Sequence, residues 1–202
     1  LTAIAAHGQT LFHSPPNTIQ WLDPALLAYE TRCQVVSDFR RADCAAGGQG
    51  APLVPFADFI LFRDSRQSRL TLNLGGIANI TILPAGAKLS DVAAFDTGPA
   101  NCLMDAWSLR VRGTPRDEGG AWARSGRVDA GLLQRLLDDP YFALPPPKST
   151  GREYFNLDWL DARRTDNAAS EAVQATLLQL SVHSIAVALR GNAPEIREVY
   201  AC

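Results

Sequence analysis

A Gly-Gly pair between two apolar segments is the feature that most constrains how this chain can fold. Residues 70–83 are predicted to form two strands that turn at Gly75-Gly76, with Asn73 and Asn79 flanking the turn. Adjacent glycines allow positive φ values and a close approach of the backbone to a ligand. Consecutive N–H groups at such a turn also form a concavity suited to phosphate oxygens. The segment therefore predicts a phosphate-binding turn built from Asn73, Gly75, Gly76 and Asn79.

A carboxylate follows this hairpin closely along the chain. Asp96 is predicted at the end of an apolar strand over residues 92–95, and Thr97-Gly98-Pro99 then leads into a helix, with Pro99 near its first position. A phosphate turn followed by an acid at a strand end suggests phosphoryl transfer. The alternative is an ordinary hairpin followed by a βα turn, which a lone Gly-Gly pair would favour.

Composition narrows the classes of protein that need to be considered. The 202 residues are 47% hydrophobic and 20% charged, which is enough for one large domain or two small lobes. A net charge of −2 gives no electrostatic reason to expect nucleic acid or an anionic membrane as a partner. No apolar run approaches the roughly 20 residues of a membrane span. The spacing of Cys33, Cys44, Cys102 and Cys202 predicts free thiols that are buried in the protein, which is typical of a reducing cytoplasm. The histidines lack the spacing of metal ligands, so no metal site is expected.

Strand-like and helix-like segments alternate along the chain and predict an α/β fold. Besides the hairpin, strands are expected over residues 2–6, 18–21, 33–37 and 196–202, and helices over residues 25–31, 55–62, 101–111, 122–125, 132–137 and 167–190. The polar segment 63–69 predicts a division near residue 66, so that residues 1–66 belong to a first lobe and residues 67–202 to a second.

Two polar segments of the first lobe are candidate ligand sites. His7-Gly8-Gln9-Thr10 follows the predicted strand at residues 2–6, where α/β proteins hold their ligands, although a polar turn explains it equally well. Residues 45–52 are rich in glycine and lack charge, which suggests a backbone packed against a ligand, a hinge or a lid.

Three further features have less specific interpretations. Asp38 could be catalytic, orient a ligand, or pair with Arg40 or Arg41, and a structural ion pair is the favoured interpretation. The proline-stiffened loop over residues 141–156 carries Lys, Ser, Thr and Arg in succession and is expected to be functional. His183, on the longest predicted helix, is expected to be a packed residue rather than a ligand.

Taken together, six segments resemble one family closely, the anhydro-N-acetylmuramic acid kinases, which recycle a cell-wall sugar and have an actin-like ATPase fold. The segments follow the order and spacing of the family and cover most of the chain. They are HGQT (7–10), TIQ…DPALLA (18–28), DFRRADCAAGGQGAPLVP (38–55), NLGGIANIT (73–81), FDTGPAN (95–101) and PPKSTGREYFN (146–156).

The resemblance implies an ATP- and magnesium-dependent reaction on 1,6-anhydro-N-acetylmuramic acid, in which water opens the anhydro bond and O6 is phosphorylated. Asp96 then matches the family's general base, which activates the water, and Gly75-Gly76 matches the second phosphate-binding turn of actin-like kinases. A cytoplasmic two-lobed enzyme is implied, with an amino sugar and ATP as partners, without nucleic acid or membrane, and with a homodimer allowed. The resemblance also implies sugar-side positions in the first lobe, expected at His7, Gln9, Thr10, Gly48, Gln49 and Gly50.

The chain departs from the family pattern in several places. Ala100 and Trp21 stand where the family usually has glycine. The family's opening GTSxDG-like phosphate loop would precede Leu1, and its glycine-rich nucleotide segment would follow Cys202. The sequence is therefore expected to be an internal part of a longer kinase. This part alone is expected to bind ATP weakly.

Two other classes of function remain open at this stage. One is a degenerate actin-like binding module without activity. The other is a glycoside hydrolase that uses Asp38 and Asp96 as a carboxylate pair, which predicts a carboxyl separation of about 5–9.5 Å and turnover without ATP.

Overall fold

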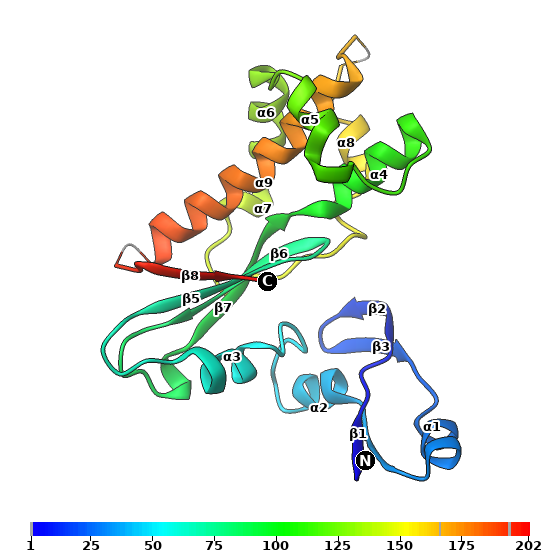
Figure 1. Cartoon of the computed structure of the whole chain (residues 1–202), viewed down its shortest axis with the longest axis vertical. Coiled ribbons are helices and arrows are strands. Elements are labelled where there is room, and N and C mark those ends of the chain that lie inside the picture. The colour runs from blue at the N-terminus through cyan, green and yellow to red at the C-terminus, as the bar shows by residue number, and fades with distance from the viewer. Residues whose placement is uncertain (1, 166, 194) are drawn as a thin grey trace. The chain divides into compact units, whose positions relative to one another are not determined.

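The computed structural model describes residues 2–165, 167–193 and 195–202, and it divides the chain into two compact units, Leu1–Leu53 and Val54–Cys202. The predicted α/β class is confirmed, because each unit combines helices with sheets of its own (Figure 1). The hairpin at residues 70–83 and the strand near the N-terminus belong to different sheets, as the predicted division into lobes requires.

The first unit contains two small sheets and two helices. Strand β1 (Ala3–Ala5) pairs in parallel with β4 (Gln34–Val36), and β2 (Gln9–Ser14) pairs antiparallel with β3 (Asn17–Trp21). Helix α1 (Pro24–Thr31) begins as expected, with Pro24 in its first turn and the Asp23 side chain accepting a 2.8 Å hydrogen bond from the Leu26 N–H.

Two elements of this unit were not predicted. Gln9 and Thr10 lie within β2, a strand that the sequence did not predict, and Pro15-Pro16 alone separates this strand from β3. Helix α2 (Phe39–Ala45) begins directly after Asp38, which the sequence placed at the end of a strand. Both elements are short and carry mixed polar and apolar residues, so neither gives a clear periodic signal.

The second unit is built on a four-stranded sheet with the order β7-β6-β5-β8. The predicted hairpin forms as β5 (Arg69–Leu74) and β6 (Ile77–Leu83), and β7 (Ala93–Pro99) pairs antiparallel with β6 after a short 3₁₀ turn at Leu89–Asp91. Strand β8 (Glu198–Ala201) lies parallel to β5 on the other side. Strand β7 is therefore an edge strand.

The two faces of this sheet differ because side chains alternate along each strand. One face packs on the long helix α9 (Ser170–Asn192), and the buried apolar cluster between them is made of Leu70, Ile80, Ile82 and Phe95 from the sheet and Ala188 from the helix. On the other face, the Thr71 and Thr81 hydroxyls each donate a 2.7 Å hydrogen bond to the buried carboxylate of Asp58. Asp58 belongs to α3 (Pro55–Phe62), so this carboxylate attaches the helix to the polar face.

The remaining helices gather around the N-terminal half of α9 (Figure 1). They are α4 (Asn101–Arg112), α5 (Ala121–Ser125), α6 (Ala130–Leu137), α7 (Pro140–Ala143) and α8 (Leu157–Asp161), with a 3₁₀ turn at Glu118–Gly120. Their core includes Trp107, Leu136, Phe155, Leu160 and Leu177. Among the described helices, α9 alone has the length and apolar composition of a membrane span, and half of that segment is buried within the protein.

The boundary between the compact units falls between residues 53 and 54, earlier than the predicted division at residue 66. The reason is α3, which packs on β5 and β6 and is joined to them through Asp58. The polar segment 63–68 is therefore the connection from α3 to β5 inside the second unit. Whether the lobes of the longer protein divide at residue 66 remains a prediction.

We expect Asp58→Ala to destabilise the second unit, because it leaves two buried hydroxyl groups without their acceptor. An unsatisfied buried polar group costs about 1–3 kcal/mol, so the free energy of unfolding should fall by about 2–4 kcal/mol. Urea unfolding measures the change. Asp58→Asn keeps a side-chain oxygen and should cost less, and an Ala variant as stable as the wild type would contradict this role of Asp58.

Candidate active site

Three of the predicted site residues form one row across the sheet. Asn73 of β5 pairs with Asn79 of β6, and Asn79 pairs with Asp96 of β7. Asn73 and Asn79 each lie two positions along their strand from a threonine that bonds Asp58, so by alternation the row lies on the polar face of the sheet. The structure thus brings together the two asparagines of the predicted phosphate turn and the predicted base.

The sequence predicted Asp96 at a strand end. In the structure it lies within β7. Strand β7 continues to Pro99, which closes the strand instead of opening the helix, and α4 begins at Asn101. The pairing of β6 with β7 slips by one residue beside Asp96, between Asn79 and Ala78. Such β-bulges are common beside active sites, where they redirect side chains.

The loop over residues 141–156, which begins within α7, borders the free edge of β7 and holds Asp96 at three points. Its backbone N–H donates a 3.0 Å hydrogen bond to the Lys148 carbonyl, and its backbone carbonyl accepts a 2.7 Å bond from the Tyr141 hydroxyl. The carboxylate oxygen Oδ2 accepts a 2.9 Å bond from the Thr150 N–H. Asp96 is 8% exposed, so its carboxylate is fixed in direction and almost fully removed from bulk water.

The side chains of Tyr141 and Lys148 in this loop have shifted pKa values. Burial, and then the nearby charge of Asp96, raise the pKa of Tyr141, so its hydroxyl remains a hydrogen-bond donor at neutral pH. Burial lowers the pKa of Lys148, whose Nζ donates a 3.0 Å bond to the Tyr141 carbonyl and lies 4.6 Å from the centroid of the Tyr141 ring.

A buried carboxylate anchors this loop to the helical core. Asp139 is 3% exposed and accepts four hydrogen bonds of 2.8–2.9 Å, from the Tyr141 N–H, the Tyr154 hydroxyl, the Trp159 indole and the Arg163 guanidinium. Burial alone would raise the pKa of Asp139, but these hydrogen bonds and the charge of Arg163 outweigh it and lower the pKa. Tyr141 is thereby fixed at both its backbone and its hydroxyl.

The Gly75-Gly76 turn is attached to the start of α4. The Gly75 carbonyl accepts a 3.0 Å bond from the Asn101 N–H, and the Gly76 carbonyl accepts bonds from the N–H groups of Ala100 and Cys102. Neither glycine has a positive φ, contrary to the conformational reason given for them above. Arg152 packs against position 76: a Cβ atom there would lie 2.5 Å from its Nε and 2.7 Å from its Nη2, so a larger residue would displace the guanidinium.

In the first unit, the structure gives intramolecular reasons for the predicted glycines. A Cβ at Gly48 would overlap the Asp43 carboxylate, and Gly50 donates its N–H to Asp43 Oδ2 over 2.7 Å. The Gly50 carbonyl accepts a 2.6 Å bond from Arg40. These contacts fold residues 47–50 back onto α2, while His7, Gln9 and Gln49 are exposed.

The expected ion pair of Asp38 is confirmed. Its carboxylate binds the Arg41 guanidinium, with Arg41 Nε 2.6 Å from Oδ1, and the hydrogen bond lowers the pKa of Asp38. The pair is solvent-exposed.

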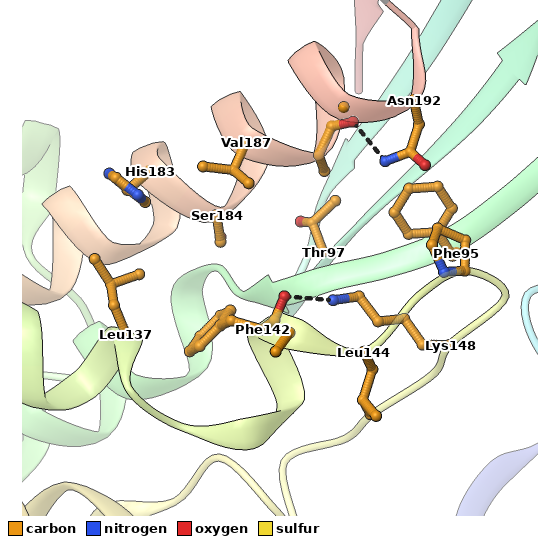
Figure 2. A pocket seen from close by; sticks show the side chains of 14 residues that line it. Phe95, Thr97, Leu137, Phe142, Leu144, Lys148, His183, Ser184, Val187 and Asn192 are labelled. Atoms are coloured by element: carbon orange, nitrogen blue, oxygen red, sulfur yellow. Dashed lines mark hydrogen bonds between the residues drawn. The ribbon is translucent and has the colours of Figure 1, made fainter.

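The apolar face of the sheet also has a pocket, of about 450 Å³, and Asp96 does not line it. Figure 2 shows its side chains reaching in from β7, α7, α9 and the loop after α7, among them Phe95, Thr97, Phe142, Lys148 and Asn192. His183 lines this pocket and is exposed, so the expectation of a packed histidine was wrong. Only the apolar side of α9 is buried in the core, and His183 lies outside that side.

The cysteines and the supporting residues complete the comparison with the sequence. Buried thiols were expected at four positions, but only Cys44 and Cys102 are buried, and burial raises the pKa of Cys102 to about 11. The part of the chain that the structure describes has no cluster of three or more metal-binding side chains. The sequence predicted that the loop over residues 141–156 is functional, but it gave no individual role to Tyr141, Thr150 or Arg152. The polar loop that contains the latter two was the available signal, whereas Tyr141 resembles an ordinary core aromatic.

Comparison with known proteins gives one consistent result. The family model described as anhydro-N-acetylmuramic acid kinase matches residues 1–202. Curated proteins named anhydro-N-acetylmuramic acid kinase are 55% identical over 99% of this chain in Chromohalobacter salexigens, 51% over 100% in Xanthomonas axonopodis pv. citri and 49% over 100% in Nitrosomonas europaea. The alignments cover 55%, 54% and 56% of those proteins, so the chain spans about half the length of the curated relatives it matches.

We expect Asp139→Asn to lower the free energy of unfolding by about 3–5 kcal/mol, the cost of breaking a buried ion pair from one side. Each carboxylate oxygen of Asp139 accepts two of the four hydrogen bonds. An amide has only one acceptor oxygen, so two of the four donors would face an NH₂ group instead. Chemical unfolding measures this loss. Asp138→Asn is the matched control, since Asp138 is exposed and accepts only from Gln134 among the described side chains.

The same carboxylate predicts a dependence of stability on pH. Because folding lowers the pKa of Asp139, its contribution is complete above the unfolded value of about 3.9 and is lost as the pH falls through the lower folded pKa. Unfolding measured from pH 5 downward should therefore show a shallower loss of stability in Asp139→Asn than in the wild type. Parallel curves would show that Asp139 does not contribute to acid sensitivity.

Proposed function

Because the chain belongs to the anhydro-N-acetylmuramic acid kinase family, we propose that the protein converts 1,6-anhydro-N-acetylmuramic acid and ATP into N-acetylmuramate 6-phosphate and ADP. Water attacks the anomeric carbon and the bond from that carbon to O6 breaks. The freed O6 accepts the γ-phosphoryl group as the bond from phosphorus to the ADP oxygen breaks. The water gives one proton to a base, so every atom is accounted for.

Asp96 is the proposed base, and its surroundings are the single observation that carries the assignment. The carboxylate is buried, and one of its oxygens is fixed by Thr150 while the backbone on either side of it is also bonded. A base held in this way can take a proton from one defined position. Positioned general bases of this kind contribute about 10²–10⁴-fold to a rate.

The row beside Asp96 supports a phosphate site on the polar face of the sheet. Asn73 and Asn79 flank the glycine turn, and their register with Asp96 brings amide groups and a carboxylate together. Kinase family membership implies ATP as the phosphoryl donor. Phosphoryl transfer needs positioning and charge stabilisation more than covalent work by the protein, and such a row provides positioning.

Magnesium is the expected companion of ATP. Proteins usually bind it through a small number of side chains together with phosphate oxygens and water. The side-chain oxygens of Asn73 and Asn79 would hold it, which leaves the Asp96 carboxylate to act as the base. When bound, the ion neutralises charge on the phosphate oxygens.

The proposal extends to the architecture and setting of the longer protein. We expect an actin-like kinase with two lobes, in which His7, Gln9, Thr10, Gly48, Gln49 and Gly50 lie on the sugar side and closure excludes water. A cytoplasmic location and a homodimer are further expectations. The exposed position of His7, Gln9 and Gln49 is compatible with contact to a substrate.

The two alternative functions have less support. The hydrolase interpretation needs Asp38 as a second catalytic carboxylate, but Arg41 already engages it in an exposed ion pair. The inactive-module interpretation predicts no turnover at all. Measuring ADP and N-acetylmuramate 6-phosphate formed from ATP and the anhydro sugar by the full-length protein distinguishes all three.

We expect Asp96→Asn in the full-length protein to lower kcat by about 10²–10⁴-fold, because it removes the base while an amide oxygen can still accept from Thr150. Dissociation constants for sugar and ATP should change far less, since the loss lies in the transition state. Asp91→Asn is the control, because this exposed carboxylate lies two residues before the start of β7. Near-normal turnover of Asp96→Asn would exclude Asp96 as the base and leave Asp38 as the next candidate.

Substitutions in the glycine turn test the phosphate site. A Cβ at Gly76 must displace Arg152, whereas a Cβ at Gly75 makes only ordinary contacts of 3.5 Å and 3.6 Å. We therefore expect Gly76→Ala to weaken ATP binding more than Gly75→Ala, with both variants folded. Calorimetric titration with a non-hydrolysable ATP analogue measures this. Equal affinities in the two variants would contradict the importance of the space above Gly76.

A further inference from the structure

Arg152 occupies an unusual position at the glycine turn. Its guanidinium lies directly over Gly76, in space that the Cβ of any other residue would fill, with Nε, Nη2 and Cζ within 3.0 Å of that position. Arg152 comes two residues after Thr150, whose N–H binds the Asp96 carboxylate. The loop along β7 therefore extends from the proposed base to the proposed phosphate turn, and it places a permanent positive charge at the turn.

This guanidinium has no structural partner among the residues that the structure describes. No hydrogen bond or ion pair of Arg152 occurs in that part of the chain, and its side chain is exposed. The charge of Arg152 acts on the nearby carboxylate of Asp105. Burial raises the pKa of Asp105, and the positive charges of Arg152 and Arg116 oppose this rise. Other arginines of this unit, such as Arg110 and Arg163, are bound to carboxylates within 2.8 Å.

The turn beneath Arg152 is also arranged for a ligand with oxygen acceptors. The carbonyls of Gly75 and Gly76 accept hydrogen bonds from the start of α4, so the amide N–H groups are the turn's remaining backbone polar groups. A guanidinium and backbone N–H groups are donors without acceptor capacity. Together they match phosphoryl oxygens, for which the planar, forked guanidinium is especially suited.

We propose that Arg152 contacts the γ-phosphoryl group and stabilises its charge during transfer, an inference that rests on the proposed kinase function. As the bond from phosphorus to the ADP oxygen breaks and the bond to the sugar O6 forms, charge on the phosphoryl oxygens is matched by Arg152. The guanidinium remains protonated throughout, so it transfers no proton. Gly76 then leaves room for the guanidinium, which a side chain at this position would displace.

The test compares Arg152→Gln and Arg152→Lys with Arg116→Gln in the full-length protein. We expect Arg152→Gln to lower kcat by about 10²–10³-fold, as loss of one charge-stabilising donor does. Arg152→Lys should recover part of the rate, because it keeps the charge without the fork. Affinity for ATP should fall more than affinity for ADP, which lacks the γ-phosphoryl group. Melting temperatures should stay close to the wild type, since no described bond is lost.

Arg116 is the matched control. It also influences Asp105, so it lies in the same neighbourhood, but its guanidinium pairs with the exposed Glu118. We expect Arg116→Gln to have wild-type turnover. An Arg152→Gln variant that behaves like Arg116→Gln overturns the inference, while absence of kinase activity in the wild type overturns the proposed function instead.

Two further measurements separate the phosphate role from other roles. If Arg152→Gln weakens sugar binding and leaves kcat and ATP affinity unchanged, the guanidinium binds the carboxylate of the sugar and the inference is wrong. A double-mutant cycle tests the link to the turn. Gly76→Ala should lower kcat in the wild-type background and have little further effect in Arg152→Gln, whereas additive losses would contradict a shared mechanism.

Discussion

The arrangement of the site depends on the hydrogen bonds that the buried carboxylate of Asp139 accepts. A lone carboxylate in this position would carry a large desolvation cost, and four donors together offset it. Two of those donors, on Trp159 and Arg163, come from the segment around α8, and two come from the loop that borders β7. The carboxylate thus joins the helical core to the loop, and Tyr141 passes that rigidity on to the backbone of Asp96.

The sheet adds a second constraint, which is the separation of its two faces. The face toward α9 is filled by side chains such as Phe95 and Ile80, so the neighbouring positions along the same strands must point to the other side. Those positions hold Asn79 and Asp96. Packing on one face thereby sets the direction of the polar side chains on the other. A slip of one residue in register would move the apolar side chains to the polar face and the polar side chains to the apolar face.

Much of this organisation could be predicted from the sequence, and the failures have physical reasons. The hairpin, the site candidates Asn73, Asn79 and Asp96, and the cap of α1 follow from local patterns that the chain carries by itself. The strand position of Asp96 was missed because Thr97-Gly98-Pro99 looks like a turn, whereas pairing with β6 extends β7 through these residues. Gly76 was recognised for a conformation that it does not use. Its partner Arg152 lies 76 residues further along the chain, and no local pattern reveals such a contact.

Helix α9 has a consequence for how this unit unfolds. Its first half contributes Val173, Leu177 and Leu180 to the helical core, and its second half contributes Ala188 to the core under the sheet. A single uninterrupted helix therefore belongs to both cores, and helix formation is cooperative along its length. Losing either core removes the packing that stabilises half of α9 and weakens the other half with it. The helical cluster and the sheet should consequently melt in one transition, as a single foldon rather than as two independent subdomains.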